Sequence, residues 1–247
     1  MHRYKLSIAY DGTDFSGWQS QKTGLGIEQL ITDALIMVLR HPIKLYGSGR
    51  TDAGVHALCQ VAHFDIPHLI SPENLCYRLN SILPKTIRIL ELIETSLLFH
   101  ARFSATKKTY YYRLHLDQIA DPFLRKYTLH IPQKLDLLEM EKGAKQLLGT
   151  HDFSSFANEQ HLGSAGKDPV RELYRIDFIP EEKGIRLEFE GNGFLYKMVR
   201  NITGTLIEVG LRKRSCASMT SLLLAKDRKQ AGKAAEPQGL YLARVDY

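Results

Sequence analysis

The segment from Gly47 to Ala57 reads Gly-Ser-Gly-Arg-Thr-Asp-Ala-Gly-Val-His-Ala and places one carboxylate, Asp52, in a loop rich in glycine. Glycine adopts backbone angles that other residues avoid, and it lets a bulky ligand approach the main chain. Arg50 precedes Asp52 by two residues, and a nearby guanidinium favours the charged form of a carboxylate. The segment therefore predicts an ionised carboxylate in a cleft, suited to act as a nucleophile or a base. The alternative is a turn residue, because aspartate bonds its own backbone in turns.

The elements expected around this loop follow one order twice. Alternating apolar residues predict strands, and apolar residues three or four positions apart predict helices. The first half is expected to form a strand at 4–10, a helix at 27–38 and strands at 43–46 and 58–66. A helix capped by Ser71-Pro72 and a strand at 87–92 complete it. For the second half we expect strands at 108–116, 173–179, 185–189 and 240–245, and helices at 137–148, 195–209 and 218–235.

This order, β-α-β-β-α-β in each half, predicts an α+β protein built from two ferredoxin-like plaits. The two halves share little sequence, so the inferred repeat is one of pattern only. The polar segment 158–169 predicts a long loop, and such loops often bind ligands.

Composition restricts the class of protein only loosely. Of the 247 residues, 44% are hydrophobic and 24% are charged, as in ordinary globular proteins. We find no apolar stretch long enough to span a bilayer and no secretory leader, so a cytoplasmic protein is expected. The three cysteines form no Cys-x-x-Cys pair, and His56 and His63 have no third ligand in register, so no metal site is expected. The net charge of +6 fits a nucleic-acid partner, although it equally serves solubility.

The loop around Asp52 also resembles the signature of the bacterial tRNA pseudouridine synthase A family. Further resemblances to this family follow in order along essentially the whole chain, at residues 9–13, 17–21, 99–105, 192–201 and 239–242. The resemblance implies two ferredoxin-like halves, 1–104 and 105–247, joined into one extended antiparallel sheet with helices on one face. The active cleft is then expected between the halves.

The resemblance assigns roles residue by residue. It makes Asp52 the catalytic nucleophile, and Tyr110 the ring that stacks on the target base. Arg50 is expected to contact RNA where a base has left its stack, and Arg200 to pair with the carboxylate. Leu240 is expected to pack beside the tyrosine. From periodicity alone, Tyr110 and Leu240 are ordinary core residues, and Arg50 and Arg200 are solvated charges.

A second set of residues is expected to contact tRNA through cations and aromatic rings, which suit phosphates and bases. The alternative interpretations are an interdomain linker for residues 99–103 and solvated surface charges for Lys167 and Arg171. The set comprises Phe99, His100, Ala101, Arg102, Phe103, Lys167 and Arg171.

The implied reaction is the isomerisation of uridine to pseudouridine at tRNA positions 38, 39 and 40, after the base is flipped out of the stem. Attack by Asp52 on C1′ or C6 and removal of a sugar proton are all compatible with one carboxylate. An isomerisation needs no electron carrier, energy source or metal, so no cofactor is expected. The resemblance also implies a homodimer that binds tRNA. The alternatives are a non-catalytic RNA-binding protein and a small-molecule hydrolase that uses Asp52.

Overall fold

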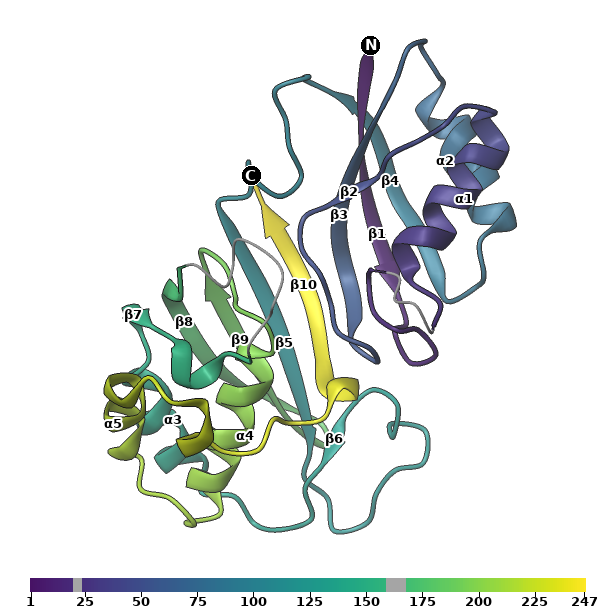
Figure 1. Ribbon diagram of the computed structural model, residues 1–247. Coiled ribbons are helices and arrows are strands. Elements are labelled where there is room, and N and C mark those ends of the chain that lie inside the picture. Colours follow the sequence, from purple (N-terminus) through teal and green to yellow (C-terminus); the bar gives the residue numbers. More distant parts are fainter. Residues whose placement is uncertain (20–23, 159–167) are drawn as a thin grey trace. The chain divides into compact units, whose positions relative to one another are not determined.

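The computed structural model describes residues 1–19, 24–158 and 168–247, and it divides into two compact units (Figure 1). Unit 1 comprises Met1–Thr106 and Tyr241–Tyr247, and unit 2 comprises Lys107–Leu240. The boundary between the two units after Thr106 lies two residues beyond the boundary predicted at 104. The last seven residues group with unit 1, whereas the sequence prediction placed them in the second half.

Unit 1 contains a sheet with the strand order β4-β1-β3-β10, and a short β2 also pairs with β3. β1 is antiparallel to both β3 and β4, whereas β10 runs parallel to β3, so the sheet is mixed rather than wholly antiparallel. The elements are β1 (His2–Tyr10), α1 (Ile27–Leu39), β2 (Tyr46–Gly47), β3 (His56–Ile66), α2 (Pro72–Ile82), β4 (Ile87–Thr95) and β10 (Leu240–Asp246).

The core of unit 1 lies between its sheet and its two helices. Tyr4, Leu6 and Ile8 alternate along β1 and are fully buried. Figure 1 shows α1 and α2 on one side of this sheet. The α2 helix begins where the sequence predicts, because the Ser71 hydroxyl accepts a hydrogen bond from the Asn74 amide at 3.4 Å.

Unit 2 contains an antiparallel sheet with the strand order β5-β9-β8-β7, and a short β6 runs parallel to β5. Its strands are β5 (Lys107–His115), β6 (Leu129–His130), β7 (Gly149–Asp152), β8 (Val170–Glu181) and β9 (Gly184–Gly191). Its helices are α3 (Leu137–Lys145), α4 (Met198–Gly210) and α5 (Ser218–Ala225), with short 3₁₀ turns at 154–156, 228–230 and 237–239.

Two predicted helices of unit 2 are shorter than expected. The helix predicted for 137–148 ends at Lys145, and the chain then turns into β7, which the sequence analysis did not predict. The helix predicted for 218–235 ends at Ala225, because Lys226 adopts a left-handed conformation. The residues that follow bond to α4 instead, where the Ala235 amide donates to the Arg200 carbonyl at 3.0 Å. Tertiary hydrogen bonds therefore override helix propensity here.

None of the helices in the described ranges is long and apolar enough to cross a membrane.

Candidate active site

The loop that carries Asp52 connects β2 to β3 in unit 1. The Val55 amide donates to the Asp52 carbonyl at 3.1 Å, and Gly54, between them, has a φ of 77°. A positive φ at the third position of a four-residue turn is the geometry of a type II turn, and it requires glycine. Asp52 is half-buried and Arg50 is exposed. The loop thus carries a half-buried carboxylate and an exposed cation on one short stretch of chain.

Thr51, the buried residue before Asp52, anchors this loop to β1 and to the segment after it. Its Oγ1 lies 2.8 Å from the Tyr10 hydroxyl, and its carbonyl accepts a hydrogen bond from the Trp18 amide at 3.1 Å. Tyr10 and Trp18 are both buried, and burial raises the pKa of Tyr10 above its ordinary value. Tyr10 therefore stays a neutral hydroxyl at physiological pH, and the backbone before Asp52 is held on two sides.

The beginning of the loop is anchored to β3. The Ser48 amide donates to the Val61 carbonyl at 2.7 Å, and the Ser48 hydroxyl donates to Gln60 Oε1 at 2.6 Å. The side-chain amide of Gln60 then donates to the Gly49 carbonyl at 3.0 Å. Ser48 and Gln60 are both fully buried, so their polar atoms satisfy one another.

Arg50 interacts electrostatically with Glu28 on α1. Burial raises the pKa of Glu28, and a hydrogen bond from the Trp18 ring and the charge of Arg50 partly offset this effect. Trp18 therefore bonds to the Asp52 loop through its backbone amide and to Glu28 through its ring. The sequence analysis quoted Trp18 only as part of a motif, and it did not predict the roles of Tyr10, Gln60 or Glu28.

Tyr110, on β5 of unit 2, is largely buried with 9% exposure. It pairs with Phe189 across the sheet, and its ring meets Phe194 edge-on with 5.0 Å between centroids. Phe194 follows Gly193, and a side chain added at Gly193 would lie 3.6 Å from Nε of Arg171. The structure thus places Arg171 beside the short segment that contacts Tyr110. Lys167, also predicted to bind tRNA, lies outside the described residues.

The segment 235–240 of unit 2 connects two predicted site residues. Arg200 on α4 bonds to its first residue, and Leu240 is its last. Nε of Arg200 donates to the Ala235 carbonyl at 2.8 Å, and the Tyr112 hydroxyl donates to the Glu236 carbonyl at 2.6 Å. Leu240 begins β10 shortly after these contacts and is 5% exposed. Tyr112 is fully buried. Burial raises its pKa, and the charge of Arg200 opposes that rise.

The residues from Phe99 to Phe103 form part of a loop of unit 1 that is held by side chains from β1, from β3 and from the last residue of the chain. Arg3 donates to the Phe99 carbonyl at 2.6 Å, and the Ala101 amide donates to Nδ1 of His63 at 3.1 Å. The Tyr247 hydroxyl donates to the Ala101 carbonyl at 2.7 Å. Ala101 is fully buried, whereas Phe103 is 74% exposed. The anchored backbone therefore presents a large ring to solvent.

His63 makes the stability of this region sensitive to acid. Burial, then the charges of Arg3 and His100, lower its pKa to about 4, although Asp65 opposes the shift. The unfolded chain binds a proton near pH 6.5 while the folded chain does not, so stability falls as pH decreases from 6.5 towards 4. Between pH 7 and 5.5 we expect His63 to account for a loss of about 1 kcal/mol, measured by urea unfolding. His63→Gln should remove that loss, whereas replacement of exposed His68 should retain it. Equal pH dependence in wild type and His63→Gln would contradict this.

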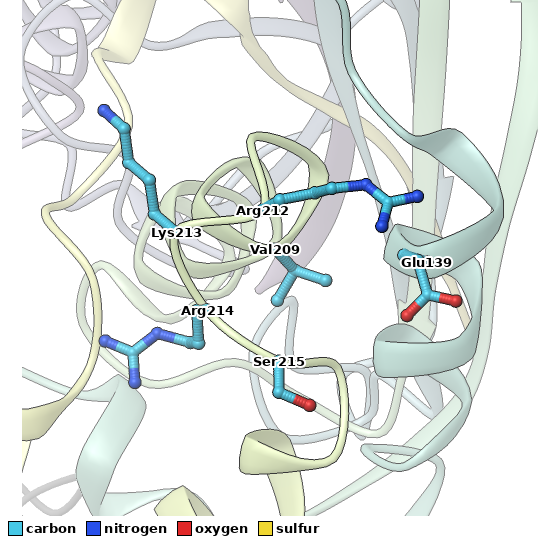
Figure 2. A pocket seen from close by; sticks show the side chains of 6 residues that line it. All are labelled: Glu139, Val209, Arg212, Lys213, Arg214 and Ser215. Carbon is cyan, nitrogen blue, oxygen red and sulfur yellow. The ribbon is translucent and has the colours of Figure 1, made fainter.

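A hollow of about 310 Å³ lies at the C-terminal end of α4, and none of the predicted site residues lines it (Figure 2). Arg212 pairs with Asp136 on the α3 side, and Arg214 pairs with Glu208 at 3.0 Å. Cations at this end also compensate the helix dipole. Two of the three cations that line the hollow, Arg212 and Arg214, are therefore paired with acids of unit 2.

Among residues 1–19, 24–158 and 168–247, no three His, Cys, Asp or Glu side chains gather as a metal site would require.

The Asp52 loop is anchored within unit 1, and Tyr110 is buried within unit 2. Comparison with known proteins specifies the class. A family model described as tRNA pseudouridine synthase matches residues 6–104 and 144–247. The chain belongs to this family, whose members isomerise uridine to pseudouridine in tRNA.

The relatives with high identity carry one name, tRNA pseudouridine synthase A. The "tRNA pseudouridine synthase A 1" of Protochlamydia amoebophila is 52% identical over 100% of this chain and 97% of its own length. The proteins of Limosilactobacillus reuteri and of an Exiguobacterium species are 46% and 43% identical over 100% of this chain, and over 97% and 98% of their own lengths. Family membership favours a tRNA-modifying enzyme over the two alternatives, a non-catalytic RNA-binding protein and a small-molecule hydrolase.

Proposed function

We propose that the protein isomerises uridine to pseudouridine at positions 38, 39 and 40 of the tRNA anticodon arm, with Asp52 as the nucleophile. The observation that carries the proposal is the Asp52 loop, where a half-buried carboxylate follows a threonine fixed from two sides. The family supports the reaction on tRNA, and the anticodon positions follow from the resemblance to the synthase A branch.

The reaction balances without any added reagent. The N1–C1′ bond breaks, the uracil turns, and a C5–C1′ bond forms. C5 then loses its proton, and N1 gains one. A carboxylate serves this sequence by attack on C1′ or C6, or by removal of a proton from the sugar. No cofactor or metal is therefore required.

The other predicted residues serve the flipped base. A uridine in a stem is reached only after it leaves the stack, which costs roughly a few kcal/mol. Tyr110 would offset this cost by stacking on the uracil, Arg50 would hold the opened stem, and Arg200 would favour the charged form of Asp52. Leu240 would pack beside the base. Tyr110 and Leu240 are buried and Arg200 bonds to the Ala235 carbonyl within unit 2, which favours preorganisation of these three side chains.

The wider RNA contact would use the loop at 99–103 together with Lys167 and Arg171, since cations and rings suit phosphates and bases. We further propose that the protein works as a homodimer in the cytoplasm. A dimer doubles the net charge from +6 to +12, which strengthens the attraction for tRNA.

The proposal is tested by mapping pseudouridine along a defined, unmodified tRNA after incubation with the purified protein, without added cofactor or metal. We expect pseudouridine at positions 38 to 40, wherever the tRNA has uridine there, and nowhere else. Pseudouridine at other positions would keep the chemistry and overturn the assigned specificity. The absence of any product would overturn the proposed reaction.

A further inference from the structure

A row of aromatic rings lies on the face of the unit 1 sheet that its helices leave uncovered. The Tyr46 ring lies 5.7 Å from the ring of His100, and His100 lies 4.4 Å from Phe103. Lys44 Nζ lies 5.0 Å from the centre of the Tyr46 ring, and the Arg102 guanidinium lies 5.6 Å from the centre of Phe103. We name Tyr46, His100 and Phe103 the ring row. It carries a cation over each end.

The ring row is built on fixed supports. Tyr46 stacks on His63 with 5.0 Å between centroids and 13° between planes, and His63 is 1% exposed. Arg3, which pairs with both oxygens of Asp65, also fixes the loop through the carbonyls of Leu97 and Phe99. The Tyr46 ring and the backbone of the loop are thus held in place before any ligand binds, which reduces the entropic cost of binding.

The charge around the ring row favours an anionic partner. Lys44 and Arg102 are both exposed, whereas the neighbouring acid Asp65 is engaged by Arg3. Aromatic rings beside exposed cations are typical of proteins that stack nucleobases between phosphate contacts.

The ring row is also separate from the Asp52 loop. His63, beneath Tyr46, lies seven residues along β3 from His56, which follows that loop. Seven strand residues span about 23 Å. A ligand on the ring row therefore lies well away from a uridine at Asp52.

We propose that the ring row binds an unpaired nucleotide of the substrate tRNA, other than the uridine that reacts. The base takes the place of Lys44 over the Tyr46 ring or of Arg102 over the Phe103 ring, and the displaced cations contact its flanking phosphates. This rests on the proposed function and extends it, because it assigns Lys44 and Tyr46 to RNA recognition and identifies an unpaired base as their ligand.

The test compares the affinity of variants for three probes at one fixed salt concentration. The probes are an unmodified tRNA, a single-stranded oligouridylate of about twelve nucleotides, and an RNA duplex of matching length. Tyr46→Ala and Phe103→Ala are each expected to weaken binding of the tRNA and the oligouridylate by about tenfold, and to leave duplex binding unchanged. Tyr46→Phe should retain wild-type affinity, because it keeps the ring.

Matched controls come from the same unit. Tyr77→Ala removes a ring that is 75% exposed on α2, and Lys85→Ala removes an exposed cation for comparison with Lys44→Ala. Neither control should change affinity. Urea unfolding of each variant identifies those that merely fail to fold, and Tyr46→Phe then decides the role of the ring.

Several outcomes would overturn the inference. Wild-type affinity in both alanine variants would do so, as would equal losses for single strand and duplex. A change in self-association instead of RNA affinity would identify the ring row as a protein interface. None of these affects the proposed function, which is tested separately by mapping the pseudouridine that the wild-type protein forms in tRNA.

Discussion

Asp52→Asn is expected to abolish pseudouridine formation while leaving the affinity for tRNA within a few-fold of wild type. Asparagine has the shape of aspartate but is neither a nucleophile nor a base. Removal of the nucleophile from an enzyme costs on the order of 10⁴-fold or more in rate. Hydrogen bonds at Ser48, Thr51 and Val55 hold the loop through backbone atoms or through other side chains. The loop should therefore keep its conformation in the variant.

The measurement is single-turnover pseudouridine formation on unmodified tRNA, beside a binding titration with the same RNA. Asp14→Asn is the matched control, since Asp14 is an exposed aspartate of the same unit and should react at the wild-type rate. Loss of binding together with activity would point to a structural role for Asp52. An unchanged rate in Asp52→Asn would mean that a group other than Asp52 is the nucleophile.

The sequence predicted the elements that local patterns determine. The alternation of Tyr4, Leu6 and Ile8 predicts β1, and Ser71-Pro72 predicts the start of α2, because both signals lie within a few residues of their effect. The glycines around Asp52 predicted unusual backbone angles for the same reason, and Gly54 has a positive φ.

The features that the sequence did not predict depend on distant partners. The parallel pairing of Tyr241 with His56 joins residues 185 positions apart, and no local pattern signals it. The early end of α5 reflects the hydrogen bonds that residues 231–235 make with α4. Within the site, the part of Trp18 in holding Thr51 depends on the fold that brings them together. The motif at 17–21 was the one signal in the sequence that pointed to Trp18.

Gly17→Ala is expected to impair both activity and stability, because Gly17 packs against the backbone of the Asp52 loop. Its φ is 98°, a left-handed value that alanine adopts at a cost of about 1 kcal/mol. A β-carbon there would also lie 2.4 Å from the Thr51 carbonyl oxygen and 2.9 Å from the carbonyl carbon of Asp52. The loop must shift to relieve these contacts, and a shift of about 1 Å costs on the order of 10²-fold in rate.

Gly149→Ala separates these two causes. Gly149 has a φ of 93°, but a β-carbon there would meet no atom closer than Nε2 of His151 at 3.8 Å. It should therefore lose about 1 kcal/mol of unfolding free energy and keep the wild-type rate of pseudouridine formation. Gly17→Ala should lose about 2 to 3 kcal/mol and most of its activity. If the two variants were equally stable and equally active, the Asp52 loop would tolerate displacement, and the anchoring at Thr51 would not control catalysis. A slow but fully folded Gly17→Ala protein would instead show that the position of Asp52, and not its presence alone, sets the rate.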